Sequence, residues 1–193
     1  MNFLAHLYLA GDSESLIIGN FIGDFVKGQL KDQFPPEIIK GISMHREIDF
    51  YTDNHPIVLE SKIRLRSRYR HYSGVLVDIY YDHLLAVNWS TYSKVSLENF
   101  TQNKYALLMS KMEILPEKVK YMLPHMINDN WLLNYRNVEG IGRSLNGMAR
   151  RTKFNSGLET GIFELMSNYS LFDQEFNAFF PELIEYVNQL KLK

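Results

Sequence analysis

Histidine and aspartate recur at fixed intervals in the stretch Met44–Pro56, which reads M-H-R-E-I-D-F-Y-T-D-N-H-P. His45, Asp49 and Asp53 are spaced four residues apart, and Arg46 follows the first of them. On an α-helix this spacing places the three side chains along one face, a turn apart. Imidazole and carboxylate are ligands of divalent metals that accept oxygen and nitrogen. The stretch therefore predicts either a metal-binding helix face or the solvated end of an ordinary helix.

Three further pairs of polar residues repeat this spacing in segments that are otherwise apolar: Asn2/His6, Asn20/Asp24 and Asp78/Asp82. A buried carboxylate without a partner costs several kcal/mol, so it needs a cation or hydrogen-bond donors. Two carboxylates ~4 Å apart repel by about 4 kcal/mol at an effective dielectric near 20. Arg46 alone could not neutralise a cluster that contains several such carboxylates. Convergence of the four faces would therefore favour a divalent metal. The alternative is a set of separate, hydrogen-bonded polar groups.

The metal hypothesis assigns roles to the members of these pairs. An oxygen-rich site suits Mn²⁺ or Mg²⁺, and two histidines shift the preference toward Mn²⁺, Fe²⁺ or Zn²⁺. Asn2 and Asn20 would orient the ligating side chains. The expected ligands are Asp24, His45, Asp49 and Asp82, followed by His6 and Asp78.

A metal with open coordination positions polarises a phosphoryl oxygen and lowers the pKa of bound water. Hydrolysis of a phosphate ester is therefore the first reaction class to consider. The sequence contains no cysteine, no G-x-S-x-G element, no G-x-x-x-x-G-K-[ST] loop and no dinucleotide-binding fingerprint. These absences argue against covalent catalysis and against the common nucleotide-binding motifs.

Length and composition limit the possible classes of protein. A chain of 193 residues fits one domain with a substantial core, which we expect to span residues 1–193. The formal net charge of −1 excludes a globally basic nucleic-acid binder. The opening residues M-N-F-L-A-H-L-Y-L-A lack the positive region of a signal peptide, and no apolar run is long enough to span a bilayer. We expect a cytoplasmic protein without a membrane partner.

The spacing of apolar residues predicts helices throughout, so the fold class is all-α, in a compact helical bundle. The arginines of 56–72 alternate as they would on a strand, but the surroundings lack β-branched runs bounded by turns. Pro181 predicts a helix break at Phe179-Phe180. The expected helices cover 2–10, 13–27, 36–52, 56–72, 74–89, 97–112, 116–128, 130–136, 138–151 and, as one or two helices, 156–192.

Six stretches resemble the bacterial acyl carrier protein phosphodiesterase family, and the match runs in order from Met1 to about Arg151. They are M-N-F-L-A-H-L-Y-L-A, G-N-F-I-G-D-F-V-K-G, G-I-S-M-H-R-E-I-D, T-D-N-H-P, D-I-Y-Y-D-H-L-L and N-W-L-L-N-Y-R. The resemblance implies a metal-dependent hydrolase, usually associated with Mn²⁺. Such an enzyme removes the 4′-phosphopantetheine arm from the serine of holo acyl carrier protein and leaves the apo form.

The resemblance also implies a distant relation to HD-domain phosphohydrolases. The sequence lacks a His-Asp dipeptide and has only the reversed Asp82-His83, so the ligand assignments rest on helix spacing. In this interpretation Asp24 belongs to the catalytic group, Arg46 holds the phosphodiester and His83 protonates the leaving serine oxygen. Two alternatives are an HD-type nucleotide hydrolase acting on ppGpp-like substrates and a non-catalytic module that binds carrier proteins.

Acyl carrier proteins are small and acidic, so a partner needs a local positive surface. Two groups of basic residues qualify, and the sequence does not predict an oligomeric state. The first group is Lys62, Arg64, Arg66, Arg68 and Arg70, and the second is Arg143, Arg150, Arg151 and Lys153.

Overall fold

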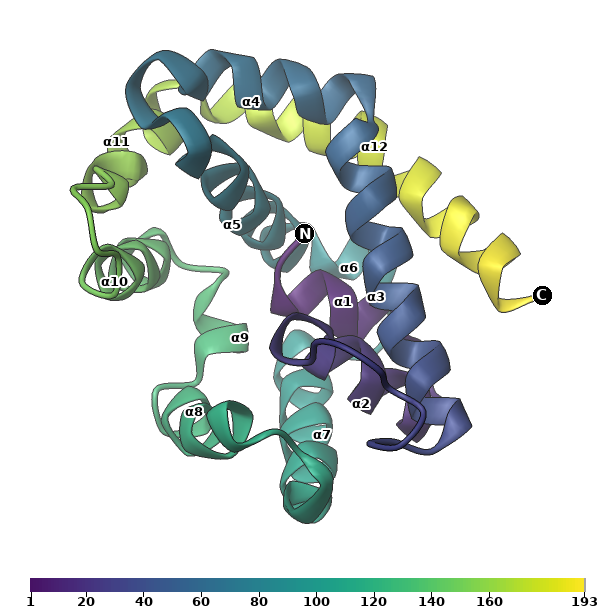
Figure 1. Ribbon diagram of the computed structural model, residues 1–193. Helices are drawn as coiled ribbons and strands as arrows, with labels where there is room; N and C mark the ends of the chain where they lie inside the picture. The colour runs from purple at the N-terminus through teal and green to yellow at the C-terminus, as the bar shows by residue number, and fades with distance from the viewer. Residues whose placement is uncertain (193) are drawn as a thin grey trace.

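The computed structural model describes residues 1–192, and helices without any strand make up the regular structure of that range (Figure 1). The prediction of an all-α fold is confirmed. None of the helices in this range is long and apolar enough to cross a membrane. The α-helices are α1 (Phe3–Leu9), α2 (Glu14–Ile22), α3 (Pro36–Asn54), α4 (Pro56–Tyr69), α5 (Ser73–Val87), α6 (Trp89–Tyr92), α7 (Leu97–Ser110), α8 (Glu117–Asn128), α9 (Trp131–Asn134), α10 (Val138–Ala149), α11 (Gly161–Ser167) and α12 (Tyr169–Lys191), and the 3-10 turns are η1 (Gly23–Phe25), η2 (Arg70–Tyr72), η3 (Met112–Ile114) and η4 (Leu158–Thr160).

Helix α1 occupies the middle of the molecule, with α3 on one side and α8 to α10 on the other (Figure 1). Helices α2 and α3 pack with their backbones in contact at two glycines. A Cβ added to Gly41 would lie 2.8 Å from the carbonyl oxygen of Leu16, and one added to Gly19 would overlap the backbone of Ile38. This close approach places the end of α2 against the middle of α3, where His45 and Asp49 lie.

One buried hydrophobic cluster connects these helices and includes residues from Met1 to Val187. Aromatic side chains of α12 form much of it. Phe172 and Phe176 meet the rings of Tyr80 and Tyr81 on α5 edge to face, with centroids 5.0 and 5.6 Å apart. Such contacts add to the burial of large rings and fix α12 against α5.

The second helix ends earlier than its apolar pattern predicts. We expected it to continue to about Lys27, but α2 ends at Ile22 and the chain continues as the 3-10 turn η1. A Cβ on Gly23 would overlap the ring of His45, so the chain at this point lies directly against α3. Asp24 therefore projects from a 3-10 turn, and its spacing from Asn20 is not that of a continuous α-helix.

The predicted break at Pro181 is also wrong. The chain breaks at Asn168, between α11 and α12, and α12 continues through Pro181 to Lys191. A proline inside a helix costs about 3 kcal/mol. Burial of Phe179, Phe180 and Leu183 on either side of the proline offsets this cost. The basic segment 56–72 forms α4 and η2, as the helical interpretation predicted.

Candidate active site

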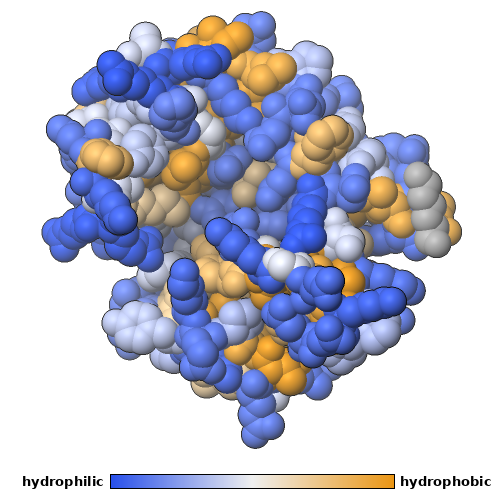
Figure 2. Space-filling view, in the orientation of Figure 1, coloured by the Kyte–Doolittle hydropathy of each residue, from blue (hydrophilic) through white to orange (hydrophobic). Residues whose placement is uncertain are grey.

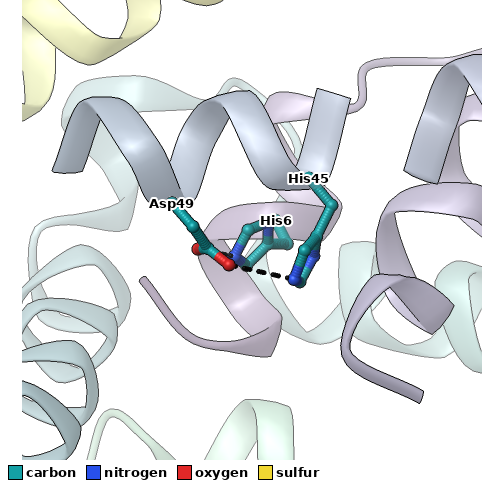
Figure 3. Close-up of side chains that lie close together, drawn as sticks. All are labelled: His6, His45 and Asp49. Carbon is teal, nitrogen blue, oxygen red and sulfur yellow. Dashed lines mark hydrogen bonds and ion pairs between the residues drawn. The ribbon is translucent and has the colours of Figure 1, made fainter. Parts of the chain in front are cut away.

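His6 on α1 meets His45 and Asp49, which lie one turn apart on α3 (Figure 3). Nε2 of His6 lies 3.1 Å from Oδ1 of Asp49, and Nε2 of His45 lies 3.1 Å from Oδ2 of the same carboxylate. The two imidazole rings stack with their centroids 4.0 Å apart. One ligand atom from each of the three residues lies within 4.8 Å of the others. His6, His45 and Asp49 thus form a group that could hold a metal ion.

Asn20, at the end of α2, orients both imidazoles. Its side-chain oxygen lies 2.8 Å from Nδ1 of His6, and its backbone carbonyl oxygen lies 2.8 Å from Nδ1 of His45. Both oxygens accept hydrogen bonds, so each histidine donates from Nδ1 and directs Nε2 at Asp49. This is the arrangement by which a neighbouring group fixes the tautomer of a metal-ligating histidine.

The hydrogen-bond donors and acceptors of this group fit a cation. A neutral His6 that donates from Nδ1 presents a lone pair at Nε2, and that lone pair faces a carboxylate that can also only accept. The same applies to His45, whose Nε2 also lies 3.2 Å from Oδ1 of Asp24. Either protons or a metal must satisfy these facing acceptors. Imidazole nitrogen with carboxylate oxygen is a ligand set for a divalent transition metal.

The charge states of the metal-free group follow from its burial and contacts. Burial opposes a charge on His45, but the hydrogen bonds to Asp24 and Asp49 prevail and raise its pKa to about 9. Burial alone would raise the pKa of Asp49, yet contacts with both histidines hold it well below its usual range. Burial lowers the pKa of His6. Without a metal, a proton on His45 compensates the carboxylates.

Asp24 joins the group to an open cleft. Its hydrogen bond to His45 lowers the pKa of its carboxyl, and its side chain is 71% exposed. The cleft has a volume of about 690 Å³ and lies between α1 and η1 on one side and α8 to α10 on the other. Figure 2 shows the hollow, with apolar side chains visible on its walls. The residues that line it include Phe3, Phe25, Met122, Trp131, Tyr135, Arg143, Met148 and Arg151.

The second acidic pair, on α5, has different partners. Asp82 is fully buried and accepts hydrogen bonds from the backbone amides of Asn2, Leu4 and Ala5, at 3.2, 2.7 and 3.3 Å. It therefore caps the N-terminus of α1. Asp78 accepts a hydrogen bond from the amino group of Met1, which also lies 3.8 Å from Asp49.

The remaining predicted site residues lie at the margin or outside the group. Asn2 donates from its side chain to the hydroxyl of Tyr135 at 3.4 Å and lines the cleft. His83 is buried, with Nδ1 2.6 Å from the carbonyl of Tyr135 and Nε2 3.1 Å from the hydroxyl of Tyr169. Both ring nitrogens are therefore engaged within the fold. Arg46 is exposed on α3 and forms no ion pair within residues 1–192.

The two groups of basic residues also differ. On α4, Lys62 pairs with Asp53 at 2.6 Å, and Arg64 donates two hydrogen bonds to Glu175, at 2.9 and 2.5 Å. Arg68 pairs with Glu164 at 2.6 Å. In the second group, Arg143 and Arg151 line the cleft. Arg150, the neighbour of Arg151 in the sequence, is exposed and forms no ion pair within residues 1–192.

Sequence reasoning did not assign the aromatic residues of the cleft. Trp131 and Tyr135 are contributed by α9 and the residue after it, and Tyr135 is 2% exposed although it borders the cleft. Both belong to the N-W-L-L-N-Y-R stretch, which indicated the family but suggested no role. Its apolar residues are also what a scaffold helix would contain, so their position beside Asp24 required the fold.

The helices and the imidazole–carboxylate group define an all-α protein with a group of side chains that could hold a metal ion. A family model described as "Acyl carrier protein phosphodiesterase" matches residues 1–183. The chain belongs to the acyl carrier protein phosphodiesterase family, as the resemblance indicated. No solved structure matches the chain, so the expected likeness to HD domains has no structural neighbour to support it.

Curated relatives cover the chain from end to end. A protein of Escherichia coli O6:H1 (strain CFT073) is 34% identical over 193 residues, with 100% of both chains covered. One from Photorhabdus laumondii subsp. laumondii is 34% identical over 189 residues, or 96% of this chain and 94% of the relative. One from Escherichia coli O157:H7 is 35% identical over 185 residues, or 95% and 96%. Each is named acyl carrier protein phosphodiesterase.

Proposed function

We propose that this protein hydrolyses the phosphodiester that joins 4′-phosphopantetheine to the serine of holo acyl carrier protein. Water forms the new bond to phosphorus, the bond to the serine oxygen breaks, and that oxygen leaves with a proton. The products are 4′-phosphopantetheine and apo acyl carrier protein. Family membership supports the substrate, and the facing acceptors of His6, His45 and Asp49 are the observation that supports a metal-dependent reaction.

His6, His45 and Asp49 would hold a divalent cation, with Asp24 as a further ligand at the side of the cleft. Such a cation supplies positive charge that stabilises the charge developing on the phosphoryl oxygens. A mixed set of imidazoles and carboxylates suits Mn²⁺, with Fe²⁺ or Mg²⁺ as alternatives. Asn20 would hold both imidazoles in the orientation that directs Nε2 at the cation. Asp78 and Asp82 would act indirectly, by positioning the start of α1 and thereby His6.

For three other residues we propose roles that differ from those expected from sequence. His83 would support the wall that contains Tyr135, because its ring is held by Tyr135 and Tyr169. Arg143 and Arg151 border the same cleft as Asp24 and are better placed than Arg46 to meet an anionic substrate. Arg150, with these two arginines, would contact the acidic carrier protein at the mouth of the cleft.

The direct test is conversion of holo to apo acyl carrier protein, followed by mobility on a gel and by the mass lost from the carrier protein. We expect turnover with Mn²⁺ and none after chelation. A parallel incubation with ppGpp separates the alternatives, because an HD-type nucleotide hydrolase would cleave ppGpp and leave the carrier protein intact. A binding module would retain the carrier protein without converting it, whether or not metal is present.

A further inference from the structure

The cleft beside Asp24 has the dimensions of a small-molecule site. Its volume of about 690 Å³ falls within the range of roughly 300–1,000 Å³ that is typical of such sites. A folded carrier protein cannot enter a space of this size. The flexible arm that the carrier protein bears can enter it, and the arm contains the phosphate that must reach Asp24.

We propose that this cleft holds the pantetheine arm of the substrate, with its phosphate end at Asp24 and within reach of Arg143 and Arg151. The inference rests on the proposed function and adds the part of the substrate that the protein recognises. Specificity would then come from the arm as well as from the surface of the carrier protein.

The walls match the chemistry of the arm. Pantetheine alternates apolar and polar segments, namely a dimethyl-substituted carbon, a hydroxyl, two amides and a thiol. The cleft offers the apolar side chains of Phe3, Phe25 and Met148 together with the polar side chains of Asn134 and Ser144. Small-molecule sites typically combine apolar walls with a few polar groups that fix orientation.

Charge favours the same orientation. Arg143 and Arg151 border the cleft and form no ion pair within residues 1–192, although Nε of Arg151 donates to the carbonyl of Gly147 at 3.1 Å. Arg151 also lies close enough to Tyr135 to influence the phenol electrostatically. A guanidinium presents a fork of donors suited to phosphate oxygens. Two carboxylates, Asp24 and Asp129, also border the cleft. Asp24 contacts His45, so a cation bound by His6, His45 and Asp49 would reduce the repulsion between Asp24 and the phosphate.

Two glycines of α10 provide a matched pair of variants. A Cβ added at Gly142 or at Gly147 meets no atom within 4 Å, so both positions accept a side chain. Of these two glycines, Gly147 lines the cleft and Gly142 does not. Gly147→Phe should fill part of the cleft, while Gly142→Phe adds the same ring elsewhere on the same helix. Both changes should maintain or raise helix stability, because glycine is a poor helix former.

Binding of 4′-phosphopantetheine, measured by calorimetry on the full chain, is the decisive experiment. We expect Gly147→Phe to weaken binding at least about tenfold, the factor that corresponds to about 1.4 kcal/mol, and Gly142→Phe to bind like the wild type. Arg143→Gln and Arg151→Gln should weaken the binding of 4′-phosphopantetheine. They should not weaken the binding of pantetheine, which lacks the phosphate. Equal affinity of the two glycine variants would overturn the inference.

Tryptophan fluorescence gives a second measurement, which does not depend on a variant that fills the cleft. The sequence has two tryptophans. Trp131 lines the cleft, and Trp89 is buried in the core with 5% of its surface exposed. Addition of 4′-phosphopantetheine should change the emission of the wild type and not that of Trp131→Phe. An unchanged wild-type spectrum together with calorimetric binding would place the ligand elsewhere and refute the inference.

The two proposals fail in different ways. If the wild type converts holo acyl carrier protein and Gly147→Phe converts it equally well, the arm lies outside this cleft and the proposed function stands. If 4′-phosphopantetheine binds as expected but holo carrier protein is not converted, the cleft assignment stands and the proposed function fails.

Discussion

Helices α3 and α5 each carry two polar residues four positions apart, and the fold uses the two pairs differently. On α3, His45 and Asp49 face each other and His6, so three groups meet whose nearest atoms are acceptors. On α5, Asp82 faces backbone amides that can only donate. The first arrangement requires a proton or a cation, whereas the second is satisfied by the fold itself. Identical spacing determines a shared helix face, and the opposing element determines the chemistry.

The largest expected effect distinguishes Asp49 from Asp53 on the same helix. Asp49→Asn should lower turnover of holo acyl carrier protein by at least the roughly 100-fold that disturbing groups around a bound metal can cost. Metal affinity, measured by calorimetry, should fall with it, while the helical circular dichroism spectrum should stay close to that of the wild type. Asp53→Asn is the matched control, because within residues 1–192 Asp53 forms its ion pair with Lys62 at the surface. If both variants lose activity equally, α3 acts through its stability and not through ligation.

Removal of Asp82 should have the opposite profile. Asp82→Ala leaves three amides at the start of α1 without acceptors, two of them on fully buried residues, and should cost about 2–4 kcal/mol of unfolding free energy. Urea denaturation in the presence of a chelator measures this loss. Asp82→Asn retains one acceptor oxygen and should lose less. Loss of metal binding with an unchanged urea midpoint would mean that Asp82 is a ligand after all.

The two regions should also respond to pH in different ranges when metal is removed. Burial raises the pKa of Asp82 from 3.8 to about 7, so the folded state retains a proton that the unfolded chain releases. Stability should therefore fall as pH rises from about 4 to about 7, and Asp82→Ala should remove this step.

His45 should account for a second step at higher pH. Its pKa rises from 6.5 to about 9, so its contribution is complete below pH 6.5 and is lost as pH rises through 9. We expect a decrease of about 2 kcal/mol, reduced from the unscreened value because Asp24 and Asp49 are partly exposed. Mn²⁺ should abolish this step, since a cation replaces the proton. A step that persists unchanged in His45→Gln would assign the titration to another group.

The smallest expected effect concerns two surface arginines, one with an ion-pair partner and one without. Arg68 is paired with Glu164, while Arg150 has no ion-pair partner within residues 1–192. Arg150→Gln should raise KM for the carrier protein by roughly threefold at low salt, and the effect should shrink as salt screens the charges. Arg68→Gln should leave KM unchanged. The reverse result would locate docking on α4 and restore the first group of basic residues as the partner surface.

The sequence predicted the helical class, because periodicity is a local property. It also named six candidate ligands, of which the fold brings His6, His45 and Asp49 together. His45 and Asp49 share one helix, so their proximity follows from spacing alone. The roles of Asp82 and His83 could not be predicted, since their partners lie on α1, after α9 and on α12. The same limit applies to Pro181, which is tolerated because of rings that pack from other helices.

The link between Asp82 and α1 has a consequence for biogenesis. The amides of Leu4 and Ala5 are separated from their acceptor by 78 and 77 residues of chain. Contacts of such separation form late, because the entropy of closing the intervening loop must be overcome first. Helix α1 therefore gains the acceptor for its first amides only after α5 has been synthesised. His6 lies on α1, so the group of His6, His45 and Asp49 that could hold a metal ion should be complete only once α1 has docked.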